Sequence, residues 1–259
     1  MNLTQKMIIA TTSILLVLGS ASGFATEGGA APQELSKTQA TSSKSNLERQ
    51  KKEAMDIFHP QDKKPGHLTV LYDGTDHSLS FNYLGITSSD YDEYTKMLSK
   101  YKAPELQQPG GLPEGYMFKS GEIVPPYPSF LTKAYESMLK ELKAEANGKK
   151  YYAKKLKWNE AGGAAVIFSK DSDVIRISSQ KVQPLITEVT RVPSKGEKFE
   201  NLNINGIDAI YSTNSNDLYS TKLRWEDPEK QFQYEISIYK KSPLTKEDLV
   251  AIAEHMIQE

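Results

Sequence analysis

Residues 199–240 read FENLNINGIDAIYSTNSNDLYSTKLRWEDPEKQFQYEISIYK, and this stretch decides the fold. Segments rich in β-branched and aromatic residues alternate here with turn residues. We expect four short strands, at 199–204, 207–212, 218–225 and 232–239. Asn205-Gly206 is the strongest turn signal, because both residues tolerate the positive φ of a tight hairpin turn. Consecutive hairpins of this kind predict an antiparallel sheet.

The strand pattern continues upstream of this stretch, and helical patterns flank it. We expect further strands at 68–72, 77–83, 116–124, 151–158, 164–169, 174–179 and 185–191. Apolar residues at three- and four-residue spacing predict helices at 45–58, 89–101, 130–146 and 246–256. These elements predict an α+β fold: a curved antiparallel sheet of about eight or more strands, with amphipathic helices packed on one face, including a C-terminal helix.

Capping residues mark the ends of the predicted helices. The expected N-caps are, in chain order, Ser45, either Ser88 or Ser89, Ser129 and Thr245. Ser45 and Glu48 have the spacing of a capping box, in which the serine oxygen accepts a free amide and the glutamate reaches back. Asn147-Gly148 is expected to end the third helix, because these residues adopt positive φ readily.

The N-terminus predicts export. Residues 1–25 have the three-part layout of a secretory signal peptide: a polar start, an apolar run at 7–18 and a string of small residues. Cleavage fits after Ala25 and also after Ala21. We therefore expect a secreted or cell-envelope protein. An uncleaved anchor is the alternative, because the apolar and small residues together approach the ~20 residues that a spanning helix needs.

Composition divides the rest of the chain into three parts. Residues 26–45 are small and polar with no apolar period, which predicts a disordered tether. Residues 46–109 are expected to form a helix–hairpin–helix region, and a linker rich in Pro, Gly and Gln closes it. Residues 110–259 are expected to form the antiparallel-sheet domain, with a helical insertion near 130–147.

Charge and cysteine content exclude several classes of protein. The net charge is −1 at pH 7, which gives no general attraction to nucleic acid. The sequence contains no cysteine, so disulfides, thiolate metal sites and a thiol nucleophile are excluded. An exported protein without cysteine suits a Gram-positive cell envelope and has to be held together by its core.

The second half of the chain resembles a known family. The resemblance covers about 110–259 and rests on the order of four motifs: Leu112 to Tyr116 (LPEGY), Asn203 to Gly206 (NING), Leu223 to Glu226 (LRWE) and the closing helix that follows Leu244. It is similar to a family of unknown function found outside the membrane in Gram-positive bacteria, often as the outer half of anti-sigma factors and in sporulation lipoproteins. The resemblance implies a lipoprotein-carrier-like fold, a half-open sheet curved around helices. It brings no catalytic residues with it.

Few residues of the sequence are candidates for catalysis or for binding a metal ion. His67, Asp73, Asp76 and His77 lie around one predicted hairpin and offer nitrogen and oxygen ligands to a metal ion. Their spacing matches no metal motif, so a solvated turn is the expected interpretation and we predict no metal and no cofactor. No motif of a nucleophile elbow, a zinc protease or a phosphate-binding loop is present. We therefore expect a protein that is not an enzyme.

A lysine-rich stretch at 149–158 is the one unusual surface feature. The candidate binding residues for an anionic wall polymer or another polyanion are Lys149, Lys150, Tyr151, Lys154, Lys155 and Lys157. The alternative is an amphipathic edge strand: Tyr152, Leu156 and Trp158 would point inward, and the lysines would discourage edge-to-edge pairing.

These observations predict an exported, non-enzymatic binding or sensing module of the bacterial cell envelope. A curved sheet with a helix across it can leave an apolar groove for a lipid, a peptide or an envelope protein. Two alternatives stay open: an envelope hydrolase that uses unrecognised carboxylates, and a protein associated with a cell-wall polyanion through the lysine-rich stretch. Nucleic acid is not an expected partner.

Overall fold

Two antiparallel β-sheets and four α-helices make up the part of the chain that the computed structural model describes, residues 34–187, 193, 195–214 and 216–258. The predicted signal peptide at 1–25, the first part of the predicted tether at 26–33 and most of the predicted strand at 185–191 lie outside these residues. Within the described ranges, no helix combines the length and the hydropathy that crossing a membrane requires.

The helices are α1 (Glu34–Phe58), α2 (Tyr91–Lys100), α3 (Lys133–Ala146) and α4 (Lys246–Gln258). The strands are β1 (His67–Asp73), β2 (Ser78–Leu84), β3 (Ile86–Ser88), β4 (Met117–Val124), β5 (Tyr151–Lys155), β6 (Gly163–Lys170), β7 (Asp173–Lys181), β8 (Glu197–Ile204), β9 (Ile207–Asn214), β10 (Thr221–Asp227) and β11 (Phe232–Ile238). A large sheet has the order β3-β4-β6-β7-β11-β10-β9-β8, and a small sheet has the order β2-β1-β5. This confirms the predicted α+β class, although the strands divide between two sheets.

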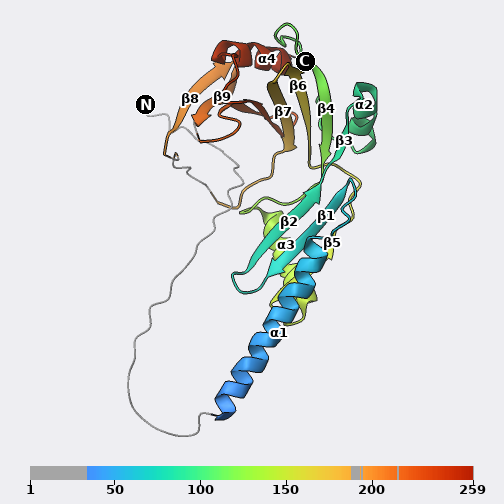
Figure 1. Ribbon diagram of the computed structural model, residues 1–259. Helices are drawn as coiled ribbons and strands as arrows, with labels where there is room; N and C mark the ends of the chain where they lie inside the picture. Colours follow the sequence, from blue (N-terminus) through green and yellow to red (C-terminus); the bar gives the residue numbers. More distant parts are fainter. Residues whose placement is uncertain (1–33, 188–192, 194, 215, 259) are drawn as a thin grey trace.

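Figure 1 shows the large sheet bent around on itself, with α4 across its upper end and α2 beside β3 and β4. The small sheet lies below it, and α1 projects downward from the small sheet. Asn205 and Gly206 form the predicted hairpin turn between β8 and β9, with φ of 51° and 88°. The local turn chemistry therefore sets the register of the two strands at this edge, where Ile204 pairs with Ile207.

The main hydrophobic core lies on one face of the large sheet. Seven residues of the large sheet that belong to this core have no exposed surface: Ile123, Val166, Phe168, Ile175, Ile177, Leu223 and Ile236. α2 and α4 bury their apolar sides in the same core, through Tyr94, Met97, Leu98, Leu249, Ile252 and Ala253. Both helices therefore cover the same face, as the apolar stripes of their sequences predict.

A close contact in this core depends on a glycine. Gly121 of β4 lies directly under the ring of Tyr94, and a Cβ atom built at Gly121 would lie 2.1 Å from Cδ2 of that ring. Tyr94 has no exposed surface, and its hydroxyl donates to the carbonyl of Leu106 at 3.0 Å. A residue without a side chain thus lets α2 approach the sheet closely.

The small sheet has a helix on each face. On one face, α1 packs Ala54 and Phe58 against Leu71 and Ala153. On the other face, α3 packs Tyr135 and Leu142, together with other residues, against side chains that include Val70, Tyr72 and Leu79. The central strand β1 is therefore buried on both faces, which fits the mostly apolar composition of 68–72, where Thr69 is the one aliphatic polar residue.

The small sheet combines segments that the predicted domain boundaries separate. β1 and β2 come from the predicted region at 46–109, whereas α3 and β5 come from the predicted insertion and the lysine-rich stretch that follows it. β3 and α2 belong to the large sheet and its core. A boundary at 109/110 thus does not separate the two sheets, because β1 pairs with β5 across it. Local sequence carries no signal of this pairing.

Aromatic residues join the two sheets. The ring of Tyr127, which follows β4, stacks on Phe81 and Tyr83 of β2 with centroid distances of 5.6 and 5.3 Å. On the other side of the junction, the indole N–H of Trp158 donates to the carbonyl of Gly66 at 2.8 Å. Trp158 also packs against the main core, so it links the end of the small sheet to the large one.

Helix α1 begins earlier than the sequence pattern predicts. It starts at Glu34 and not at Ser45, so residues 34–45 of the predicted tether are helical. This segment contains Ala, Leu, Glu, Gln and Lys, which favour helix, and neither Gly nor Pro interrupts the chain from Glu34 to Phe58. The capping-box spacing at Ser45 therefore does not mark a helix end.

Two other helices use different caps from those predicted. The side chain of Asp90, and not that of Ser88 or Ser89, accepts the amide of Glu93 at the start of α2. Thr132 caps α3 by accepting the amide of Tyr135 at 3.1 Å. Both residue types are favoured caps, so sequence alone offered competing candidates within a few residues. The prediction at Thr245 is confirmed: its hydroxyl oxygen accepts the amide of Asp248 in the first turn of α4, and the carboxylate of Asp248 accepts the amide of Thr245.

Candidate functional site

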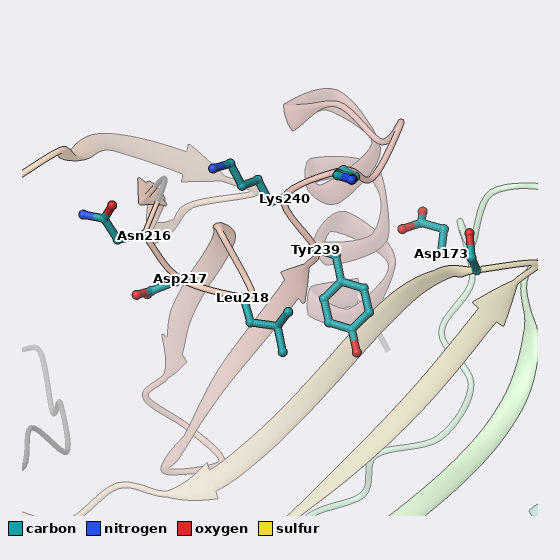
Figure 2. A pocket seen from close by; sticks show the side chains of 8 residues that line it. Asp173, Asn216, Asp217, Leu218, Tyr239 and Lys240 are labelled. Carbon is teal, nitrogen blue, oxygen red and sulfur yellow. The ribbon is translucent and has the colours of Figure 1, made fainter.

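A hollow of about 580 Å³ lies at one end of the large sheet. Three segments meet there: the turn between β6 and β7, the connection between β9 and β10, and the chain that follows β11. The lining residues are Ser172, Asp173, Asn216, Asp217, Leu218, Tyr239, Lys240 and Lys241. Figure 2 shows Leu218 and Tyr239 side by side, with Lys240 above them; Asp173 lies beyond Tyr239, on the side away from Leu218.

The carboxylate of Asp173 is held by protein donors. Its Oδ2 atom accepts the hydroxyl of Ser242 at 2.7 Å and also accepts the hydroxyl of Tyr116. Burial raises the pKa of Tyr116, and the hydrogen bond to Asp173 raises it further. Tyr116 is therefore a neutral donor at physiological pH. These contacts fix the start of β7 to the segment before α4.

The second carboxylate at the hollow is also paired. Lys222 of β10 donates to Oδ2 of Asp217 at 3.2 Å. This contact stabilises the β9–β10 connection against the strand that it leads into. Both carboxylates at the hollow therefore accept protein donors.

The apolar part of the hollow comes from Leu218 and Tyr239. Leu218 is 72% exposed, one of the most exposed large apolar side chains among the described residues. Tyr239 packs against Tyr219 with a centroid distance of 4.7 Å, and burial together with the hydrogen bond to Tyr239 raises the pKa of Tyr219 to about 12. The amide of Lys240 donates to the carbonyl of Leu218 at 3.3 Å, which ties the end of β11 to the β9–β10 connection.

Basic side chains complete the hollow. Lys240 and Lys241 come after Tyr239 in the chain that follows β11, and both residues are exposed. An exposed apolar wall beside lysines offers contact area to an apolar group and charge to an anion. The lining of the hollow thus combines an apolar wall with two lysines and two carboxylates that accept protein donors.

The candidate residues of the lysine-rich stretch do not share one surface: some contact α1 or α3, and others face solvent. Lys154 points to α3, where it lies 2.6 Å from Glu145 and 3.0 Å from Glu141. Burial alone would lower the pKa of Lys154, but its hydrogen bonds with the two glutamates raise it overall. Lys154 is thus paired within the protein.

The other candidate residues of this stretch divide between the sheet and solvent. The ring of Tyr151 packs against α1, with Nζ of Lys51 at 5.6 Å from its centroid. The backbone amide of Lys150 donates to Gln50 of α1 at 2.9 Å. Four lysines are exposed: Lys149, Lys150, Lys155 and Lys157. Nζ of Lys150 lies 3.5 Å from the carbonyl oxygen of Gly74, so Lys149, Lys155 and Lys157 are the stronger candidates for binding an anion.

The edge-strand alternative describes this stretch better than a single binding face does. β5 forms one edge of the small sheet. Tyr152 and Leu156 pack beneath α3, and Trp158 packs against the main core, as the alternation predicts. The binding of a wall polymer stays a prediction, and it concerns only the exposed lysines.

The residues considered for a metal ion do not come together. His67 and Asp73 lie at opposite ends of β1. Asp73 accepts the amide of Thr75, and Asp76 accepts the hydroxyl of Ser78. Throughout the described part of the chain, no group of three or more His, Cys, Asp or Glu side chains could hold a metal ion.

Sequence reasoning missed the hollow, because its lining comes from three segments far apart in the chain. Leu218 was expected to begin a strand at 218–225, whereas β10 begins at Thr221 and leaves Leu218 in the connection. The one signal available was an apolar residue just after the polar run at 213–217.

The fold and the hollow define an α+β protein built on a bent, open antiparallel sheet, with a ligand-sized depression at one end. The model of the family described as Domain of unknown function (DUF4367) matches residues 108–256, and the chain belongs to that family. The match agrees with the resemblance predicted for 110–259. It leaves out α1, β1, β2, β3 and α2. No significant match to a curated protein or to a solved structure was found.

Proposed function

We propose that this protein is an exported, non-enzymatic binding module of the bacterial cell envelope, and that the hollow holds its ligand. The observation that carries the proposal is the exposure of Leu218 on the wall of a hollow of about 580 Å³. Ligand sites generally have volumes of roughly 300–1,000 Å³ and apolar walls with a few polar groups. Support for export comes from the signal-peptide layout of residues 1–25.

The chemistry of the lining favours an amphipathic anion, such as a lipid or a peptide with an acidic group. Leu218 and Tyr239 offer apolar contact, and Lys240 and Lys241 offer positive charge. The two acidic side chains of the hollow are engaged by Ser242, Tyr116 and Lys222, so they oppose an anion less than two unpaired carboxylates would.

A fluorescence titration with anilinonaphthalene sulfonate, itself an amphipathic anion, tests the proposal. Leu218→Asp is expected to weaken binding at least tenfold, because it removes apolar contact and adds a like charge. Met117→Asp is the matched control, since Met117 is 73% exposed and lies outside the hollow. Equal loss of binding in both variants would show that the dye binds elsewhere and would contradict the proposal.

The natural ligand is sought by native mass spectrometry of the protein purified from its own envelope. A retained lipid or peptide that is lost from Leu218→Asp but kept by Met117→Asp would support the proposal. A retained mass that both variants keep would place the ligand outside the hollow.

A second candidate function is association with an anionic cell-wall polymer. It is favoured by the exposure of Lys149, Lys155 and Lys157 beside one edge of the small sheet. The test is a sedimentation assay with purified cell walls at rising salt. A triple Lys→Glu change should release the protein, and a variant that stays bound as well as the wild type would refute this function.

A further inference from the structure

The chain contains two Asn-Gly pairs, and both lie at turns. Asn147 and Gly148 follow α3, whereas Asn205 and Gly206 connect β8 and β9. All four residues are exposed, and both asparagines have positive φ, 48° and 51°. Exposure and conformation therefore do not distinguish the two pairs.

The hydrogen bonding of the glycine amide does distinguish them. The amide of Gly206 donates to Oδ1 of Asn203 at 3.1 Å. Asn203 is itself held in place, because its Nδ2 donates to Oδ1 of Asp208 at 3.1 Å. At the other pair, the amides of Asn147 and Lys149 donate to α3, whereas the amide of Gly148 between them has no acceptor among the described residues.

Space around the glycine does not distinguish the two pairs, because a Cβ atom built at Gly148 or at Gly206 would meet nothing within 4 Å. The chain around each asparagine does distinguish them. Asn147 lies beyond the last turn of α3, so it can rotate without breaking a strand ladder. Asn205 lies between Ile204 and Ile207, which pair with each other and close the hairpin.

We propose that Asn147 is a site of spontaneous deamidation and that Asn205 is protected from it by the fold. The backbone nitrogen of Gly148, after losing its proton to hydroxide, attacks Cγ of Asn147. A bond forms between this nitrogen and Cγ, and the bond from Cγ to the side-chain nitrogen breaks. The departing nitrogen takes a proton from water and leaves as ammonia, which regenerates hydroxide. Water then opens the resulting succinimide at either carbonyl and yields aspartate or isoaspartate.

The modification places a negative charge at an unfavourable position. Asn147 lies at the C-terminal end of α3, where the helix dipole disfavours an anion. It is also two residues from Lys149, the first of the exposed lysines beside β5. Deamidation therefore weakens the end of α3 and reduces the positive charge of that surface.

Peptide mapping by mass spectrometry after incubation of the full chain in mildly alkaline buffer measures both sites. The rate at each site is divided by its rate in the urea-unfolded chain, which removes the influence of neighbouring side chains. We expect folding to slow Asn205 several-fold more than Asn147. An equal or greater slowing at Asn147 would overturn the proposal.

Asn203→Ala provides a second test that does not depend on comparing the two turns. It removes the acceptor of the Gly206 amide and should raise the rate at Asn205 several-fold, with no change at Asn147. A circular dichroism spectrum checks that the variant is folded. An unchanged rate at Asn205 in the folded variant would contradict the protective role of this hydrogen bond.

Discussion

Replacing Gly121 with alanine is expected to destabilise the protein strongly. The added Cβ would lie 2.1, 2.4 and 2.5 Å from three atoms of the Tyr94 ring, well inside the 3.4 Å at which ordinary contact begins. The ring would have to retreat by roughly 1 Å to restore van der Waals contact. It has no free space to do so, because Tyr94 is completely buried and packs against Phe118.

The cost has two parts. Overpacking of a well-packed core typically costs about 1–3 kcal/mol. Displacement of the ring also weakens the hydrogen bond from the Tyr94 hydroxyl to the Leu106 carbonyl, which contributes about 1 kcal/mol. We therefore expect Gly121→Ala to lower the free energy of unfolding by about 2–4 kcal/mol. The melting temperature should fall by roughly 5–10 °C for a chain of this size.

Urea denaturation followed by tryptophan fluorescence measures this change, because Trp225 is buried in the main core and Trp158 packs against it. A double-mutant cycle with Tyr94→Ala tests the cause, since removal of the ring should make Gly121→Ala nearly free of cost. The reasoning is refuted if Gly121→Ala costs less than about 0.5 kcal/mol, or if it costs the same with and without the ring.

Two further predictions concern the junction of the sheets and the buried histidine. Tyr127→Ala should lower the free energy of unfolding by about 2 kcal/mol, because it removes the ring stacked on Phe81 and Tyr83. Tyr127→Phe keeps the stacked ring, so in the same urea titration it should lower the free energy of unfolding by less than half as much. His67 is buried and its Nε2 has no hydrogen-bond partner among the described residues; burial, followed by the charges of Lys155 and Lys63, lowers its pKa below 6.5. As the pH falls below about 6.5, the unfolded chain takes up a proton that folded His67 resists, so stability should decrease between pH 7 and pH 5. His67→Gln should reduce this decrease, and an unchanged pH profile in that variant would exclude His67 as its source.

Local signals predicted much of the large sheet. The hairpin at Asn205-Gly206 and the cap at Thr245 depend on residues within a few positions of each other, and both are confirmed. β3 was missed, because three residues are too few to show an alternating pattern. Competing polar residues caused the errors at the starts of α2 and α3, since Ser, Asp and Thr all serve as caps.

Pairings between distant segments could not be read from the sequence. The strands at 68–72 and at the lysine-rich stretch were both predicted, but their pairing was not, because nothing in either segment identifies the other. The hollow has the same origin: Asp173, Leu218 and Tyr239 come together only once β7, β10 and β11 are placed in the sheet.

The pairing of β1 with β5 also sets an order of events while the chain is being made. β1 is synthesised about 80 residues before β5. Closing so long a loop has an entropic cost, which the pairing of the two strands has to offset. Until then, β1 and β2 can form only a two-stranded hairpin, which is marginal in water. Both faces of β1 are buried in the finished fold, so the nascent hairpin exposes Leu68, Val70, Leu71 and Tyr72 until later segments cover them. The small sheet is therefore the part of this protein most dependent on completion of the chain, and the most exposed to aggregation before that point.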